Sequence, residues 1–180
     1  MRAPVRRGNQ LRIGVAIPIP EPYTSTLTRA RSDAGDPLAH SVPPHITLLP
    51  PTVIEPEHLG EVVDHLTAVA SAQAPFVIEL DGTASFRPVS PVVFVAVAAT
   101  GANACAVLQQ KVNQGPLAQE LRFPYHPHVT IAHDLADDHL DRAERLMAGF
   151  DAVFPVAHFS LYEFADDGVW RDVSTFVLSN

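Results

Sequence analysis

A four-residue phrase whose side chains can do acid–base chemistry occurs twice in the chain, as PHIT at residues 44–47 and as PHVT at residues 127–130. Each copy begins a short apolar, β-branched run bounded by proline, which is typical of a buried β-strand. Residues i and i+2 of a strand point to the same face, so each histidine shares a face with its threonine. If the two strands lie side by side, two imidazoles and two hydroxyls converge on one anion-binding spot.

Two imidazoles suit in-line displacement at phosphorus. One can take a proton from the attacking oxygen and the other can give one to the leaving oxygen, because the pKa of imidazole lies near neutral pH. The threonine hydroxyls can donate to the non-bridging phosphate oxygens. This chemistry requires no cofactor, and the chain has no dense carboxylate cluster for two-metal catalysis. Because a lone histidine is more often structural and threonine favours strands for its shape, the interpretation depends on the duplication.

The paired phrases resemble the two signature motifs of the 2H phosphoesterase superfamily, which includes the 2′-5′ RNA ligases and the 2′,3′-cyclic phosphodiesterases. The resemblance covers most of the chain and implies that His45, Thr47, His128 and Thr130 are catalytic. It also implies that the protein is a hydrolase involved in RNA processing. Its substrates would be the 2′,3′-cyclic phosphate ends of RNA or nucleotides, or 2′-5′ linkages. Any ligation would reverse the opening of a cyclic phosphate, because the only lysine, Lys111, has no nucleotidyl-transfer motif around it.

Residues next to the motifs are candidates for contact with the substrate. Aromatic rings could stack on a base, and arginines could pair with phosphate. Each could equally be a core aromatic or a solvated surface charge. His126 is a candidate neighbour of the site. The candidate substrate-binding residues are Tyr125, Arg87, Phe86, Arg122 and Phe123.

Other interpretations of the histidines stay open. His126 and His128 form a His-x-His pair that could bind zinc or iron, but His133 lies five residues from His128 and faces the other side of a regular strand. We therefore expect no metal. The alternative to catalysis is a non-catalytic module that binds a nucleotide or an RNA end, and a third function is a small metal-dependent oxygenase or isomerase. The first motif continues as LLPP, which leaves open whether the substrate is RNA, a small cyclic nucleotide or an ADP-ribose-derived cyclic phosphate.

Composition narrows the class of partner. With 180 residues, of which 47% are hydrophobic, the chain can form one globular domain with a sizeable core. A net charge of −8 argues against a protein that tracks long nucleic acid, and favours an RNA end or a small cyclic nucleotide as substrate. A single cysteine excludes an internal disulfide, and no apolar run is long enough to span a membrane. We expect a cytoplasmic protein without an obligate protein partner.

The elements that position the motifs follow from periodicity and turn residues. We expect a loose tail over residues 1–10 and a single bilobal phosphoesterase domain over 11–180. Hairpins break strict strand–helix alternation and indicate an α+β fold in which motif strand, helix and hairpin repeat. The resemblance implies two pseudo-symmetric lobes of mixed, antiparallel-rich sheet, with helices on the outer faces and a central cleft. The predicted strands cover 11–17, 44–49, 75–86, 92–99, 127–133, 153–164 and 169–178, and the predicted helices cover 23–31, 55–72, 101–114 and 137–150.

Overall fold

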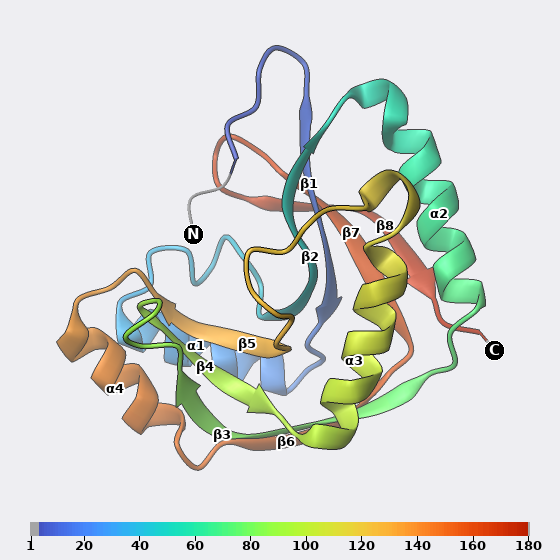
Figure 1. The fold of residues 1–180 in the computed structure, drawn as a ribbon. Coiled ribbons are helices and arrows are strands. Elements are labelled where there is room, and N and C mark those ends of the chain that lie inside the picture. The colour runs from blue at the N-terminus through green and yellow to red at the C-terminus, as the bar shows by residue number, and fades with distance from the viewer. Residues whose placement is uncertain (1–3, 180) are drawn as a thin grey trace.

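The computed structural model describes residues 4–179, so residues 1–3 of the predicted tail lie outside it. The described chain folds into one eight-stranded sheet with four α-helices (Figure 1). The α+β class is confirmed, and all strand pairs are antiparallel, in one continuous sheet where a mixed one was predicted. The elements are β1 (Leu11–Pro18), α1 (Tyr23–Ala34), β2 (His45–Ile54), α2 (Leu59–Ser71), β3 (Phe76–Ser85), β4 (Val92–Val97), α3 (Ala99–Val112), β5 (His128–His133), α4 (Asp137–Met147), β6 (Asp151–Val156), β7 (His158–Phe164) and β8 (Trp170–Val177).

The two motif strands, β2 and β5, are neighbours at the centre of the sheet. Outward from β2 the order is β1, β7 and β8, and outward from β5 it is β4, β3 and β6. Each motif strand therefore lies beside the strand that precedes it in the chain. The intervening helix contacts the other motif strand: α1 packs against β5, and α3 against β2. The predicted repeat of motif strand, helix and hairpin is interrupted in the second half, where β6 precedes the hairpin β7–β8.

The single strand predicted over residues 153–164 is wrong, because the structure divides it into β6 and β7. Only Ala157 separates the two strands, yet β6 pairs with β3 at one end of the sheet and β7 pairs with β1 near the other. The sheet must therefore curl until its β6 edge comes close to β7. Burial alternates along β6, but Ala157 and His158 are both exposed and residues 159–162 of β7 are all buried, so the alternation breaks at the junction. The sequence did not show the break because no glycine, asparagine or other turn residue marks it.

The first motif strand does not end at Pro50 and Pro51 as predicted. It continues to Ile54 and pairs with β1 along this stretch, with an irregular register around the prolines. On its other side β2 pairs with β5 only at Ile46, so the prolines lie where the second edge of the strand is free. Proline is tolerated at an edge because no ladder partner needs its missing N–H. The four predicted helices are present, with ends shifted by a few residues.

The core fixes which face of the sheet carries the motif residues. Ile46 and Val129, the central residues of the two motifs, are fully buried and belong to the hydrophobic core. Burying an apolar side chain of this size contributes about 1.5–3 kcal/mol, and a one-residue slip would place the histidines in the core instead. All four helices supply core residues, among them Leu27 and Ala34 of α1, Val62 and Leu66 of α2, Cys105 and Leu108 of α3, and Leu140 and Ala143 of α4.

A glycine turns the chain from α1 toward the first motif. Gly35 caps α1 with φ 88°, a left-handed conformation that favours glycine, and its N–H donates to the last carbonyls of the helix. A side chain there would also meet His139 of α4, because a built Cβ lies 2.7 Å from the imidazole Nδ1. None of the helices within residues 4–179 is long and apolar enough to cross a membrane.

Candidate active site

Antiparallel register brings the two motifs together on one face of the sheet. Ile46 pairs with Val129. One residue to either side, this register places each motif's histidine opposite the other motif's threonine, where Cβ atoms lie about 4.5–5.5 Å apart. The four side chains are half-buried and alternate with the buried core residues. The structure therefore brings together all four residues that the sequence singled out, namely His45, Thr47, His128 and Thr130.

The same backbone contact holds each imidazole. The Nδ1 atom of His45 lies 2.7 Å from the carbonyl oxygen of Pro43, and Nδ1 of His128 lies 2.7 Å from the carbonyl oxygen of His126. Because a carbonyl oxygen can only accept, Nδ1 carries the proton, and Nε2 of each neutral ring keeps its lone pair. A proline stands between acceptor and histidine in both motifs and restricts the backbone of the residue before it. The duplicated proline thus helps to set the tautomer.

Burial sets the charge of the two rings. Loss of hydration lowers the pKa of His45 to about 4, with the positive charge of Arg31 and of a protonated His128 acting in the same direction. Burial also lowers the pKa of His128, less strongly, and a charged His126 adds to that shift. The carbonyl contacts oppose both shifts but are outweighed. In the protein without a bound ligand, the neutral form of both imidazoles is therefore favoured at pH 7, and each can accept a proton at Nε2.

An indole that the sequence did not predict packs on the first motif histidine. The ring centroids of His45 and Trp170 are 4.3 Å apart. Phe164 at 4.3 Å and Tyr162 at 5.1 Å support the indole from β7, and the backbone N–H of Trp170 donates to the carbonyl of Ser41, 3.2 Å away. Only the hairpin β7–β8 brings Trp170 to the motif, so no local sequence signal could have found it.

Two phenylalanines pack on the second motif histidine. The ring of Phe86 lies 5.0 Å from that of His128, edge to face, and the ring of Phe94 lies 5.1 Å away. The two phenylalanine rings are 4.3 Å apart. Phe86 was predicted from the sequence, whereas Phe94 was missed because its strand reads as a uniformly apolar run. Its pairing with Thr130 in the register of β4 and β5 places it beside the site.

Two of the predicted substrate contacts bind the protein itself. The hydroxyl of Tyr125 donates to the carbonyl oxygen of Thr47 at 3.0 Å, which ties the segment before β5 to the first motif strand. Burial raises the pKa of this phenol. The guanidinium of Arg87 donates to Asp141 at 2.7 Å and to Glu144 at 2.8 Å, both on α4. Its charge is thus matched by carboxylates, and these bonds hold the turn that carries Phe86.

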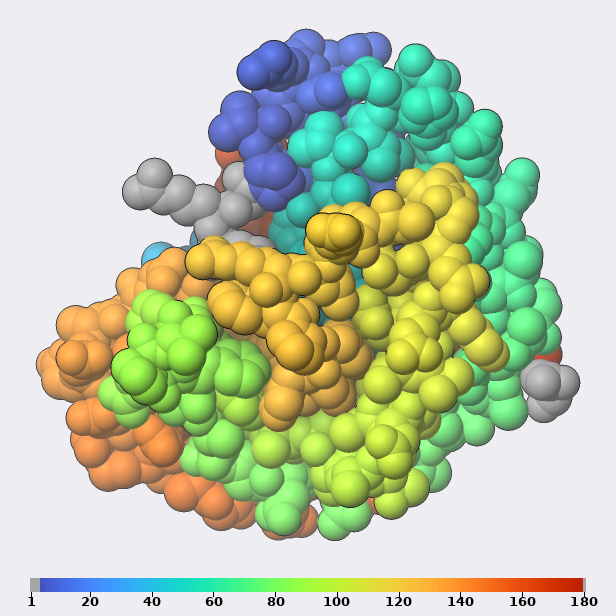
Figure 2. All heavy atoms as spheres, in the orientation of Figure 1, coloured from blue at the N-terminus to red at the C-terminus, as the bar shows by residue number. Residues whose placement is uncertain are grey.

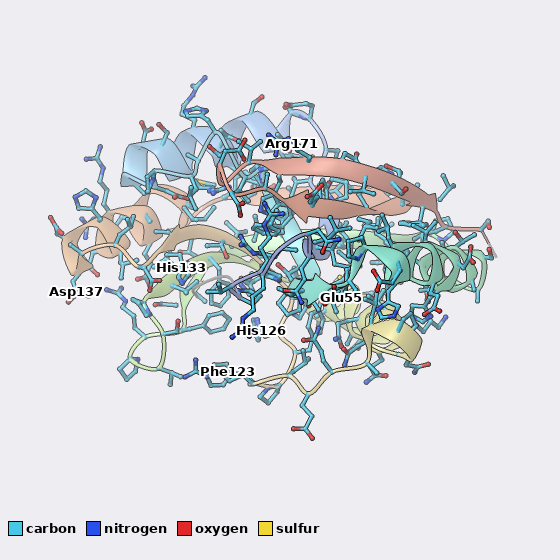
Figure 3. All side chains as sticks on the ribbon, turned by 90° about the horizontal axis from the view of Figure 1, so that it is seen from above. Glu55, Phe123, His126, His133, Asp137 and Arg171 are labelled. Carbon is cyan, nitrogen blue, oxygen red and sulfur yellow. The ribbon has the colours of Figure 1, made fainter. Side chains whose placement is uncertain are left out.

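The remaining predicted contacts lie on the surface of the segment before β5. The guanidinium of Arg122 stands 5.1 Å from the ring of Phe123, and the phenylalanine side chain is 49% exposed. Phe123 and His126 lie on the same side of the molecule (Figure 3). In the space-filling view this segment (yellow-orange) is at the surface between the blue N-terminal part and the light-green turn after β3 (Figure 2). It therefore offers an exposed ring and a positive charge beside the second motif.

A buried arginine shapes the approach to the first motif. Arg31 of α1 is 6% exposed and donates to the carbonyl oxygens of Val42 and Leu38. Its Nε also donates to Asp36 at 2.9 Å. These bonds hold the loop between α1 and β2. Near its end this loop carries Pro43, whose carbonyl oxygen accepts the hydrogen bond from Nδ1 of His45. The sequence did not single out Arg31, since an arginine on a helix is usually exposed.

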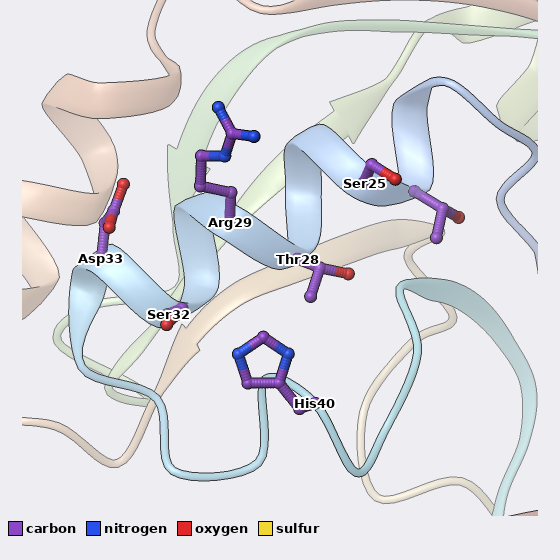
Figure 4. A pocket seen from close by; sticks show the side chains of 7 residues that line it. Ser25, Thr28, Arg29, Ser32, Asp33 and His40 are labelled. Carbon is purple, nitrogen blue, oxygen red and sulfur yellow. The ribbon is translucent and has the colours of Figure 1, made fainter.

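The motif residues line neither of two surface hollows. One hollow, of about 330 Å³, lies between α1 and His40, with Thr28 and Ser32 toward the imidazole and Arg29 and Asp33 on the other side of the helix (Figure 4). The other, of about 260 Å³, lies between the end of β1 and the junction of β6 and β7. Within residues 4–179, no group of three or more His, Cys, Asp or Glu side chains is arranged to hold a metal ion.

Comparison with known proteins places this geometry among relatives. Residues 19–168 match the family model described as the 2′-5′ RNA ligase superfamily. Over 145 residues the chain is 34% identical to a Bacillus mycoides protein named "Putative phosphoesterase", covering 79% of this chain and 83% of that protein. Proteins of the same name from Bacillus thuringiensis and Bacillus cereus match equally well.

Solved structures with the same fold include E. coli LigT. Its apo form superposes with a TM-score of 0.71 at 21% identity, covering 96% of this chain and 100% of LigT. LigT complexed with NADP+ gives 0.70 at 21% identity, and LigT complexed with 3′-AMP gives 0.63 at 17%, with the same coverage. At these identities the likeness is one of fold.

Proposed function

The chain belongs to the 2′-5′ RNA ligase superfamily, and on that premise we propose that it is a metal-independent phosphodiesterase that opens 2′,3′-cyclic phosphate ends of RNA or nucleotides. The observation that carries the proposal is the pair of half-buried imidazoles, each with Nδ1 bound to a carbonyl, on one face of two adjacent strands. Acid–base catalysis at phosphorus needs two such groups with free Nε2 atoms. Action on 2′-5′ linkages, and ligation as the reverse reaction, use the same groups.

The proposed reaction is an in-line displacement. One imidazole Nε2 takes a proton from water, the water oxygen bonds to phosphorus, and one ring P–O bond breaks. The other imidazole, protonated at Nε2, gives its proton to the leaving ribose oxygen. Thr47 and Thr130 donate to the non-bridging phosphate oxygens and hold the phosphate in line. Each proton transfer contributes about 10²–10⁴-fold to the rate.

We propose that two pseudo-symmetric halves face each other across a central cleft within a single domain of residues 11–180. The approximate twofold runs through the Ile46–Val129 pair, and each half contributes one histidine and one threonine. A cyclic phosphate centred on this axis contacts both halves at once. The two histidines can then exchange roles between ring opening and ring closure.

Substrate recognition is proposed for the half that contains β5. Phe123, with its exposed ring, can stack on a base, and Arg122 beside it can meet a neighbouring phosphate. Phe86 forms the wall next to His128. We propose that Arg87 and Tyr125 act indirectly, because their polar groups already bind α4 and the first motif strand.

The charge state of the site favours catalysis over the alternative of a non-catalytic binding module. A histidine that only grips phosphate would do so as a cation. Burial instead lowers the pKa of both His45 and His128, so the neutral form of each ring is favoured at pH 7 in the empty site, and one ring must gain a proton before it can act as the acid. A neutral imidazole is a proton acceptor, which suits a general base better than an anion receptor.

The test is turnover in a chelator. The purified protein would be incubated in EDTA with the four nucleoside 2′,3′-cyclic monophosphates and with a short RNA that ends in a cyclic phosphate. We expect hydrolysis by the wild type and a loss of at least about 10²-fold in His45→Ala and in His128→Ala. The position of the phosphate in the product gives the direction of ring opening. Activity that disappears in EDTA and returns with one metal, or binding without turnover on every substrate, would overturn the proposal.

A further inference from the structure

The indole of Trp170 packs against His45 of the first motif, whereas phenylalanine rings pack against the histidine of the second motif. Resting on the proposed phosphodiesterase activity, we propose that Trp170 is a positioning residue: it fixes the ring of His45 and shields it from water, so that His45 accepts the proton of the attacking water while His128 supplies the proton of the leaving oxygen.

Two contacts restrain the His45 ring. The indole of Trp170 covers it at a centroid distance of 4.3 Å with an angle of 38° between the planes. At the ring edge, Nδ1 is bound to the carbonyl oxygen of Pro43 at 2.7 Å. Rotation of the imidazole would break the hydrogen bond and lose the ring contact together. Nε2 therefore remains the nitrogen that is available to the attacking water.

The indole itself is held from three sides. Phe164 and Tyr162 pack against it at 4.3 and 5.1 Å, and its backbone N–H is bound to Ser41 in the loop before β2. Its Nε1 is buried with no hydrogen-bond partner among the described residues. What Trp170 gives to the site is therefore ring surface rather than a hydrogen bond. Replacement by phenylalanine removes no protein hydrogen bond.

The shielding makes the two histidines unequal. Burial lowers the pKa of His45 to about 4, and the charges that face the ring, Arg31 on α1 and a protonated His128 on β5, act in the same direction. The pKa of His128 is lowered less. When the site holds one proton, that proton therefore rests on His128. This is the state required for ring opening with His45 as base and His128 as acid.

In the proposed step each histidine transfers one proton. The attacking water loses a proton to Nε2 of His45 as its oxygen bonds to phosphorus. The ring P–O bond breaks, and the leaving ribose oxygen takes the proton from Nε2 of His128. His45 ends as imidazolium and His128 as the neutral ring. Exchange with solvent restores the starting state.

The experiment compares ring titrations with rate profiles. Histidine ring signals of wild type, Trp170→Ala and Trp170→Phe would be followed by NMR against pH without substrate, and kcat/KM for 2′,3′-cAMP would be measured over the same range in EDTA. We expect Trp170→Ala to raise the titration midpoint of His45 by about one unit or more toward the ordinary value. The acid limb of kcat/KM should move upward with it, and kcat/KM at pH 7 should fall by about 10-fold. Trp170→Phe, which keeps a ring, should give intermediate shifts.

The matched control is Phe86→Leu, which removes a ring from the other histidine. It should move the midpoint of His128 and leave that of His45 in place. An unchanged His45 midpoint in a folded Trp170→Ala protein, or an acid limb that stays in place while the midpoint moves, would overturn the inference. Absence of turnover by the wild type would overturn the proposed function instead. Because the midpoints are measured without substrate, the two failures are distinguishable.

Discussion

The two halves of the site are alike in their backbone and unlike in their side chains. His45 and His128 each occupy the first position of a strand and each donate Nδ1–H to the carbonyl two residues earlier. The residue that supplies this carbonyl is Pro43 in one half and His126 in the other. In both halves the acceptor is a main-chain carbonyl oxygen, so the hydrogen bond does not depend on the side chain of the residue that supplies it. The backbone therefore fixes geometry and tautomer identically in both halves, whatever side chain stands at that position.

The surroundings of the rings differ because they come from different parts of the chain. Trp170 from the hairpin β7–β8 covers His45, while Phe86 and Phe94 from the β3–β4 region pack against His128. Burial is the largest cause of both pKa shifts, and it acts more strongly on His45. A duplicated motif can therefore provide two identical imidazoles, while the packing around each one provides the difference in pKa that an acid and a base require.

The largest expected effect comes from removing either imidazole. His45→Ala and His128→Ala should each lower kcat/KM by about 10²–10⁴-fold, because each deletes one proton transfer. The double variant should be little worse than the single variants, since two groups that act in one step are not additive. Turnover of 2′,3′-cyclic nucleotides measures all three proteins. If one of the single variants kept the activity of the wild type, only one histidine would take part in the reaction.

The pH dependence of stability should separate the two halves next. The pKa of His45 in the folded chain is about 4, whereas in the unfolded chain it returns to about 6.5. As pH falls from 6.5 to 4, the unfolded chain binds a proton that the folded chain does not. Stability present above pH 6.5 is therefore lost over this window, by on the order of 3 kcal/mol.

Urea unfolding at pH 7 and at pH 4 measures this loss. His45→Gln, which is neutral at both values, should show a smaller difference between them. The matching variant His128→Gln should remove less of the difference, because burial shifts that histidine less. A larger effect from His128→Gln would reverse the order that the structure gives to the two halves.

The two hydroxyls should behave alike, which tests the symmetric part of the comparison. Thr47 and Thr130 occupy equivalent positions of the two motifs, each opposite the other motif's histidine in the register of β2 and β5. Thr47→Val and Thr130→Val should each lower kcat/KM by about 10- to 100-fold, corresponding to a lost hydrogen bond to a charged group of about 1.5–3 kcal/mol. Unchanged rates in both variants would contradict contact between the hydroxyls and the phosphate. Unequal losses would show that the phosphate sits nearer one half.

The motifs were readable from the sequence because they are local. A short apolar run after proline predicts a strand, and the i, i+2 spacing places His45 and Thr47 on one face. The adjacency of the two strands was a condition in that argument, and the structure supplies it through Ile46 and Val129. Trp170, which packs on His45, was not readable, because it reaches this histidine only through a hairpin at the far end of the chain.

Fold prediction failed where a local signal was absent or outweighed. The turn between β6 and β7 is the single residue Ala157, which carries no turn signal, and the pairing of β6 with β3 depends on the curl of the whole sheet. Pro50 and Pro51 gave a signal to end β2, but the free edge made that signal ineffective. The hydroxyl of Tyr125 binds the carbonyl oxygen of Thr47, a partner 78 residues away in the chain that no local signal indicated. Contact between the Tyr125 ring and a base stays a prediction.

The smallest predicted effect concerns His126, whose counterpart in the first motif is Pro43. The two residues differ in side chain, but each supplies the carbonyl oxygen that binds the motif histidine. The ring of His126 lies 6.2 Å from that of His128, and its positive charge lowers the pKa of its neighbour. His126→Gln removes the charge and keeps the carbonyl, so Nδ1 of His128 should remain protonated while its titration midpoint rises by a few tenths of a unit. Because His126 is exposed, salt screens its charge. High salt should therefore raise the His128 midpoint in the wild type and leave it unchanged in His126→Gln, as followed by NMR. A midpoint that responds equally to salt in both proteins would assign the effect to another charge, and loss of the Nδ1 proton signal in the variant would show that the side chain, and not only the main chain, holds the tautomer.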